Sequence, residues 1–289
     1  MTDQAKGLLI TLLGVFFVIP DALFGRIIDG DPASIAFWRN LLSGGMLLLV
    51  VLILQGPSIF RAAFAVGWPA IGYGLAIGAS GSLFMFAVNM TSVANVVFII
   101  ASMPAFAAIF SWVLVGERPS KRMIITMLVV AVGLVIVAVG SHGDGVSHWS
   151  GDLIALLVTI SFALALSLVR RVKGANLLPM AGLGYMAAGL VLLPFAAPVE
   201  LITSQPLKVF LHGGVFIFCS LTLLALGPRY IAAPEVALLI LLETILAPIL
   251  VWFVLGEVPG IWTWVGGAII LAALFVSNLI ALRRVRQAS

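Results

Sequence analysis

Ten long apolar stretches dominate the sequence and limit what the chain can fold into. A helix that crosses a bilayer needs about 20 mostly apolar residues. Because lipid offers the backbone no hydrogen-bond partner, a crossing segment this apolar has to be helical. The stretches are 8–27, 33–53, 69–89, 92–115, 121–139, 152–172, 176–196, 210–230, 233–255 and 261–282. The sequence therefore predicts an all-α polytopic membrane protein with ten transmembrane helices, the first of them retained.

The composition supports a membrane protein and excludes other classes. Hydrophobic residues make up 63% of the chain and charged residues only 9%, whereas soluble domains carry about 25% charged residues. The lysines and arginines lie mostly in short connections, which is typical of membrane proteins rather than of nucleic-acid binding. The single cysteine, Cys219, excludes a disulfide framework and a Cys-based zinc site. We therefore expect membrane lipid and a small molecule as partners, no nucleic acid and no cofactor.

Motifs for catalysis or ATP use are missing from the sequence. Without a G-x-x-x-x-G-K-[ST] segment, the chain cannot be the motor of an ATP-driven pump. Paired aspartate motifs, Ser–His or Ser–Lys dyads and metal-ligand clusters are also not visible. The three histidines, His142, His148 and His212, are expected in loops or at the end of a span. We therefore predict that the protein is not an enzyme and holds no metal.

The sequence repeats itself at an offset of 140 positions. Residues 235–259 align with residues 95–119, each following one apolar stretch and preceding another. The identical positions near the end of the alignment are Trp112 and Trp252, Gly116 and Gly256, Glu117 and Glu257, and Pro119 and Pro259. Similarity at a fixed offset indicates a chain built from repeated units. We predict two five-helix units, residues 1–140 and 141–289.

Because five is odd, the second unit enters the membrane from the opposite side, as an inverted-topology repeat. With the N-terminus in the cytoplasm, twelve lysines and arginines lie inside and two, Arg26 and Lys208, lie outside. This bias predicts an inner-membrane protein with both termini cytoplasmic. The two Gly-Glu-x-Pro segments are then surface turns, one on each side. Inverted repeats recur in secondary transporters, whose substrate site lies near the membrane midplane.

The repeated W-x-x-x-G-E-x-P segment resembles the ten-helix, EamA-type branch of the drug/metabolite transporter superfamily. The segments Ala-Ser-Ile-Ala-Phe-Trp-Arg (33–39) and Ala-Pro-Glu-Val-Ala-Leu-Leu (233–239) are also similar to that family. Within it, the chain most resembles the YddG-type exporters of aromatic amino acids. The resemblance implies a transporter that exports or facilitates the passage of small organic solutes.

Glu243 is the sharpest candidate for a functional residue. It lies about one residue from the centre of the ninth predicted helix, where the first unit carries Met103. A charged residue at this depth costs about 2.5 kcal/mol or more, so an ionisable group inside a span is a functional candidate. Glu243 either takes up a proton or pairs with a substrate ammonium group, or it remains neutral and donates a hydrogen bond between helices. We include Met103 among the substrate-binding candidates.

Two further polar positions lie on the aligned helices. Glu235 is on the same face of its helix as Glu243 and about 12 Å closer to the cytoplasm. Because it lies in the first turn, a capping role that favours the helix dipole is the preferred interpretation, with gating or coupling as the alternative. Asn95, its aligned partner, lies at the outer end of the fourth helix and is a candidate for substrate binding.

Asp21 and Arg39 lie at similar depths in the first two predicted helices, each six residues from the outer end. They could pair as an outer gate, or Arg39 could anchor a substrate carboxylate with Trp38 and Tyr73 as aromatic walls. The structural alternatives are a permanent ion pair, or an Arg39 side chain that extends toward the interface. Both interpretations remain open.

Three prolines inside predicted helices are expected to bend them. Pro20 precedes Asp21 and lacks a backbone N–H group, which would bend the first helix there. Pro104 and Pro248 lie in the middle of the fourth and ninth helices, and each could kink its helix and free a carbonyl group toward a cavity. We include Pro104 and Pro248 among the gating candidates.

Together these features predict alternating access, in which the two units rock around a central cavity. We expect the substrate to be an amino acid with an aromatic or other apolar side chain, and a monomer is the working assumption. The same fold could instead export cationic drugs or metabolites such as nucleosides. A sugar phosphate is disfavoured, because only Arg39 places a positive charge inside a span.

Overall fold

The structure is a computed structural model that describes residues 3–116, 118–140, 148–172, 174–226, 230–231 and 233–288. The described residues form helices and connections without a strand. The first unit contains α1 (Asp3–Val18), α2 (Pro20–Ile27), α3 (Pro32–Gln55), α4 (Ser58–Ala65), α5 (Trp68–Met90), α6 (Val93–Ala101), α7 (Met103–Val115) and α8 (Lys121–Gly140). The second contains α9 (Trp149–Arg171), α10 (Leu178–Val191), the 3-10 helix η1 (Leu193–Phe195), α11 (Pro198–Ser204), α12 (Pro206–Val209), the π-helix η2 (Phe210–Ile217), α13 (Phe218–Leu226), α14 (Ala233–Leu255) and α15 (Ile261–Ala288).

The helices confirm the predicted number of membrane crossings. In the described part of the chain, nine segments are long and apolar enough to cross a membrane, and α14 contains a shorter apolar helix, Leu239–Leu255. Some crossings consist of consecutive helices, such as α1 with α2, α6 with α7, and α12 with η2 and α13. With α14 counted as a crossing, the bundle has the ten predicted spans.

Prolines account for two of the interruptions. The first crossing breaks at Ile19, directly before Pro20, which cannot donate to the carbonyl four residues earlier and would clash with it. The fourth crossing breaks at Ser102, so that Pro104 lies in the first turn of α7, where its missing N–H group costs nothing. Pro248 lies inside α14, which continues through it as one helix. The kink expected at Pro248 stays a prediction.

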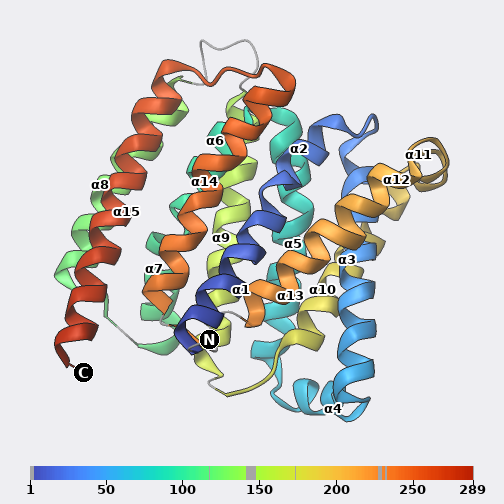
Figure 1. Cartoon of the computed structure of the whole chain (residues 1–289), viewed down its shortest axis with the longest axis horizontal. Helices are drawn as coiled ribbons and strands as arrows, with labels where there is room; N and C mark the ends of the chain where they lie inside the picture. Colours follow the sequence, from blue (N-terminus) through green and yellow to red (C-terminus); the bar gives the residue numbers. More distant parts are fainter. Residues whose placement is uncertain are drawn as a thin grey trace.

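Both termini lie at the same end of the bundle (Figure 1). We call this the terminal end, and the opposite one the distal end. The last helix of the first unit, α8, ends at the distal end, and the second unit begins there with α9. The second unit therefore crosses in the opposite direction, as the inverted repeat predicts.

The two units interlock instead of forming separate lobes. In the first unit α1 packs on α13 and α14, and in the second unit α9 packs correspondingly on α5, α6 and α7. The pairs α3 with α10, α6 with α14, and α8 with α15 join equivalent helices of the two units. The main hydrophobic core accordingly contains residues from both units. A site in the middle of this bundle is built by both.

Glycines allow the closest helix contacts. A Cβ atom on Gly184 in α10 would lie only 1.9 Å from the carbonyl oxygen of Gly74 in α5. At the edge of the bundle, a Cβ atom on Gly133 in α8 would lie 2.9 Å from the carbonyl oxygen of Gly266 in α15. Without side chains at these positions the backbones approach closely, as small residues permit in membrane helices.

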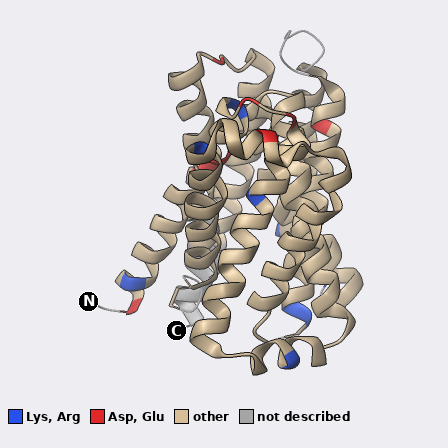
Figure 2. Cartoon of the chain, turned by 90° about the vertical axis from the view of Figure 1, so that its right-hand side faces the viewer, with Lys and Arg blue, Asp and Glu red and all other residues tan. Residues whose placement is uncertain are grey.

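Charged residues lie mainly toward the two ends of the bundle (Figure 2). Most acidic residues are toward the distal end, whereas Lys and Arg occur at both ends and a few lie between them. The few charged groups in the interior are therefore the starting point for the functional site.

Candidate functional site

A buried ion pair joins α2 to α3. Asp21 follows Pro20 at the start of α2, and Arg39 lies two turns into α3; only 3% of Asp21 and 5% of Arg39 is exposed. Arg39 Nε donates to Asp21 Oδ1 at 2.8 Å, and Arg39 Nη2 donates to Asp21 Oδ2 at 2.5 Å. Two parallel bonds of this kind suit the planar guanidinium. The pairing considered from the sequence is present, and the two charges match each other inside the bundle.

The rest of the Arg39 guanidinium is also occupied. Its Nη1 donates to Asn40 Oδ1 at 3.1 Å and to the carbonyl oxygen of Gly81 at 3.4 Å. Asn40 in turn donates from Nδ2 to Ser82 Oγ at 2.8 Å. The ring of Phe84 lies 5.8 Å from the guanidinium carbon, within the range of a cation–π contact. Every nitrogen of the guanidinium therefore has a protein acceptor.

The aromatic residues around the pair differ from those expected. Tyr185 of α10 is 5% exposed and interacts with Arg39; a Cβ atom on Gly81 would lie 2.5 Å from its ring. Trp38 instead donates from Nε1 to the carbonyl oxygen of Pro198, the first residue of α11, at 2.8 Å. Tyr73 packs in the apolar clusters around α5 and α10. Tyr185 and Phe84 therefore lie against the Arg39 guanidinium, and the roles of Trp38 and Tyr73 as walls of a substrate site stay a prediction.

His212 is not in a loop or at the end of its span. It lies in the π-helix η2 and is 1% exposed, with Nε2 2.7 Å from Asp21 Oδ1. Its ring stacks on Phe24, with centroids 5.3 Å apart. Because Asp21 is ionised beside Arg39, we assign Nε2 as the donor. The expectation from sequence fails because helical structure continues back through α12 to Pro206, so that His212 lies inside the bundle.

Two features of η2 mark the position of His212 as unusual, and the first of them, the Gly213-Gly214 pair, is visible in the sequence. Gly213 follows His212 and packs against the backbone of Arg39, where a Cβ atom would lie 2.9 Å from the Arg39 carbonyl oxygen. Gly213 thus lets η2 approach the backbone of Arg39 closely. π-Helical turns are rare, and they are often found at functional sites.

Glu243 lies in the middle of α14, on the face that packs into the core. Its neighbours on this face, Leu239, Leu242, Leu246 and Leu250, are partly buried hydrophobic residues that pack against the main core. Glu243 is partly exposed, and its carboxylate has no hydrogen bond or ion pair with the described residues. The charges of Asp21 and Arg39 are near enough to act on it. Glu243 is therefore a carboxylate without a partner beside a pair that is complete.

Asn95 belongs to a separate polar network near the distal end. It is fully buried, donates from Nδ2 to Asp152 Oδ1 at 3.1 Å and to Thr91 Oγ1 at 3.3 Å, and accepts from Thr263 Oγ1 at 2.6 Å. These bonds tie α6 to α9 and α15. With both its amide group and its carbonyl oxygen engaged, Asn95 presents no group to a solute in this structure. The side chain of Glu235, its aligned partner, lies outside the described residues.

The remaining candidates lie on the broken fourth crossing. Met103, which the repeat aligns with Glu243, is the first residue of α7 and is partly exposed. Pro104 follows it and is also partly exposed. The break at Ser102 therefore lies at the level where the repeat places Glu243 in the other unit.

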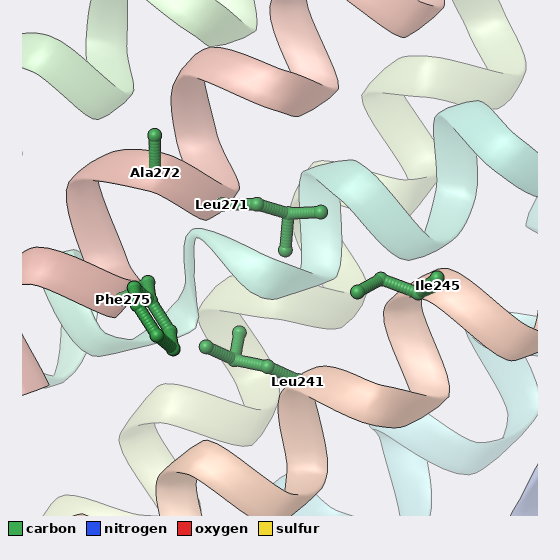
Figure 3. Close-up of a pocket in the computed structure, with 5 residues that line it drawn as sticks. All are labelled: Leu241, Ile245, Leu271, Ala272 and Phe275. Carbon is green, nitrogen blue, oxygen red and sulfur yellow. The ribbon is translucent and has the colours of Figure 1, made fainter.

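An apolar groove of about 240 Å³ lies between α14 and α15 (Figure 3). It is lined by Leu241, Ile245, Leu271, Ala272 and Phe275. Leu241 and Ile245 are two positions before and after Glu243, roughly 160° around the helix from it. The groove therefore lies on the opposite face of α14 from the carboxylate.

Metal ligands are not gathered in the described part of the chain. No group of three or more His, Cys, Asp or Glu side chains there could hold a metal ion.

Comparisons with known proteins agree with this architecture. A sequence model of the EamA-like transporter family matches the chain twice, over residues 5–139 and 149–279, once in each predicted unit. Nineteen chains of solved structures match. One of them, described as "Crystal structure of protein", has a TM-score of 0.64 and 17% sequence identity, over 96% of this chain and 98% of that chain. At that identity the likeness shows the fold alone. No curated protein matches the chain.

Proposed function

The chain belongs to the EamA-like transporter family of the drug/metabolite transporter superfamily, and on this basis we propose that it moves amino acids across the inner membrane. The favoured substrates have aromatic or other apolar side chains, and the protein acts as an exporter or a facilitator. The finer likeness to YddG-type exporters stays a prediction.

The observation that carries the proposal is the unpaired carboxylate of Glu243. A charge inside a membrane bundle is costly unless an opposite charge or a hydrogen-bond donor meets it. In the described structure Asp21 has such partners, whereas Glu243 has none. An ammonium group of a substrate would supply both the charge and the donors. We therefore propose that the Glu243 carboxylate binds the amino group of the substrate.

The surroundings of Glu243 favour a substrate whose side chain is apolar. The side chains that flank Glu243 on its face of α14 are apolar, and binding sites for small molecules combine mostly apolar walls with a few polar groups. In the part of the chain that the structure describes, Arg39 is the cationic residue that interacts with Glu243, and it is already fully engaged in this conformation. Arg39 could bind the substrate carboxylate only by exchanging Asp21 for the substrate. We therefore propose that the Asp21–Arg39 pair shapes and gates the site.

The fold supports transport by alternating access. The two units interlock across the bundle, and both contribute to the core around Glu243. Breaks at Ile19 and Ser102 divide the first and fourth crossings, which gives the bundle places where half-helices can move separately. With the termini in the cytoplasm, as the distribution of Lys and Arg predicts, the distal end faces outward.

A second candidate cargo follows from the same observation. Any organic cation would neutralise Glu243, so a cationic drug or a protonated nucleoside analogue would also fit the charge. The two candidates differ in what accompanies the positive charge, because only an amino acid brings a carboxylate that could compete with Asp21 for Arg39.

A competition panel in liposomes tests the proposal. Purified protein would release a preloaded, labelled aromatic amino acid, and unlabelled amino acids, cationic drugs and nucleosides would compete with it. We expect apolar amino acids to compete and their N-acetylated forms, which lack the ammonium group, to fail. Release of cations without release of any amino acid would establish the second candidate and overturn the first.

A further inference from the structure

The Gly-Glu-x-Pro turn is a repeated sequence feature that the proposed function does not use. In the second unit it joins α14 to α15 at the distal end. Gly256 ends α14 with a positive φ of 70°, and its N–H group bonds to the carbonyl oxygen of Trp252 at 2.8 Å. The chain then turns so that Glu257 faces the bundle, with its side chain only 12% exposed. This residue of a surface turn is thus largely buried.

The Glu257 carboxylate links three segments of the chain. Its Oε1 accepts from the backbone N–H group of Val93, the first residue of α6, at 2.8 Å. Its Oε2 lies 3.3 Å from Nη2 of Arg26, in the last turn of α2. The same Nη2 donates to the carbonyl oxygen of Thr91 at 2.9 Å. Glu257 therefore caps α6, where a negative charge favours the helix dipole, and also pairs with α2.

The linked helices carry the charged groups of the site. Glu257 directly follows α14, which carries Glu243, and Arg26 lies on α2, which carries Asp21. Between Glu243 and the turn, α14 contributes Ala247 and Val251 to the core, which are 2% and 1% exposed. The distal part of α14 is therefore packed against the core while the contacts of Glu257 are in place.

The arginine of this linkage, Arg26, is not fully hydrogen-bonded by the described residues. Arg26 Nε is buried and has no acceptor in the described part of the chain. An unsatisfied buried donor destabilises the state in which it occurs. Arg39 differs, because all its nitrogens are satisfied. The Arg26 guanidinium is therefore held by fewer protein acceptors than the Arg39 guanidinium.

We infer that Glu257 is a positioning residue of the transport cycle. Its contacts with Val93 and Arg26 hold the distal end of α14 against α6 and α2 and keep the site closed on that side. Their release lets α14 move away and opens the site around Glu243 to the distal side. The inference rests on the family membership and not on the identity of the cargo, so it is tested without a substrate.

The opening of the site to the distal side can be measured as the rate at which a cysteine near Glu243 reacts with a maleimide. Leu246 lies three residues from Glu243 toward the distal end, so Leu246→Cys in a Cys219→Ser background is the reporter. A membrane-impermeant maleimide is applied to each face of membrane vesicles in turn. We expect Glu257→Gln to raise the labelling rate from the distal face on the order of tenfold, and Arg26→Gln to do the same. Glu200→Gln, at an exposed carboxylate on α11, should leave the rate unchanged.

A second reporter separates opening from general loosening. Ile240→Cys lies three residues from Glu243 toward the terminal end, and its labelling from the terminal face should not rise in Glu257→Gln. An equal rise at both reporters would show that Glu257 only stabilises the fold. A folded Glu257→Gln or Arg26→Gln protein that is labelled at the wild-type rate would overturn the inference. Because these two changes affect opposite sides of the ion pair, the failure of one variant to fold leaves the other as a test.

Discussion

Two carboxylates inside predicted spans, Asp21 and Glu243, have opposite surroundings. Asp21 accepts two bonds from Arg39 and one from His212, and it is 3% exposed. Glu243 is partly exposed and has no partner among the described residues, although the Asp21–Arg39 pair is close to it. A buried carboxylate that is matched by the chain's own donors contributes to the fold. One that is not matched is available to a ligand.

The difference also explains why residue type alone is a poor guide to the site. Both residues are acidic, both lie inside predicted spans, and both are costly at that depth. What separates them is the neighbouring helix. Asp21 faces Arg39 on α3 and His212 on η2, whereas Glu243 is flanked on its own face of α14 by apolar side chains. Substitutions that remove a partner should therefore damage the two positions in different ways.

The largest effect is expected from Arg39→Ala. It leaves Asp21 as a buried charge without its main partner, which costs about 3–5 kcal/mol in the free energy of unfolding. Denaturant unfolding in detergent micelles measures this loss. Asp21→Asn should destabilise the protein similarly, and Arg39→Lys less, because lysine keeps the charge but loses the two parallel bonds. A stable Arg39→Ala protein would mean that the pair contributes little to the fold.

A smaller effect is expected from His212→Phe. The phenyl ring can keep the stack on Phe24 but removes the bond to Asp21, which Arg39 still satisfies. We expect a loss of about 1–3 kcal/mol in the free energy of unfolding, as for a buried hydrogen bond. If the loss equals that of Arg39→Ala, His212 and Arg39 are equal partners of Asp21, and the distinction between them disappears.

A still smaller loss of stability is expected at Thr263, which belongs to the polar network around Asn95 near the distal end. Thr263→Val replaces the hydroxyl that donates to Asn95 Oδ1 by a methyl group of similar size. We expect a cost of about 1 kcal/mol in the free energy of unfolding and an unchanged transport rate. If the Thr263→Val protein is stable but its transport rate falls severalfold, Asn95 contributes to substrate binding, as the sequence alone suggested.

Sequence reasoning reaches the architecture because lipid leaves few choices. Apolar length predicts the spans, and the repeat at residues 95–119 and 235–259 predicts the inversion. The Asp21–Arg39 pair can also be predicted, because two neighbouring antiparallel helices bring residues of equal depth together. Each of these inferences needs only one helix or two adjacent ones.

Contacts between helices that are far apart in the sequence could not be predicted in this way. His212 meets Asp21 only because the eighth crossing packs on the first and because that crossing begins at Pro206, before the predicted start at residue 210. Asn95 is closed off by Asp152 and Thr263, from two helices of the other unit. Glu257 bonds to Arg26 because the turn after α14 lies over the end of α2. None of these neighbours follows from spacing along the chain.

The central claim is that Glu243, and not the Asp21–Arg39 pair, faces the substrate. Glu243→Gln tests it most directly, with stability and liposome transport measured on the same preparation. We expect the free energy of unfolding to change by no more than about 0.5 kcal/mol, because no partner is lost. Transport of an amino acid should fall on the order of tenfold or more, because its ammonium group loses the counter-charge inside the bundle. A wild-type transport rate with an unchanged dependence on pH would contradict the claim.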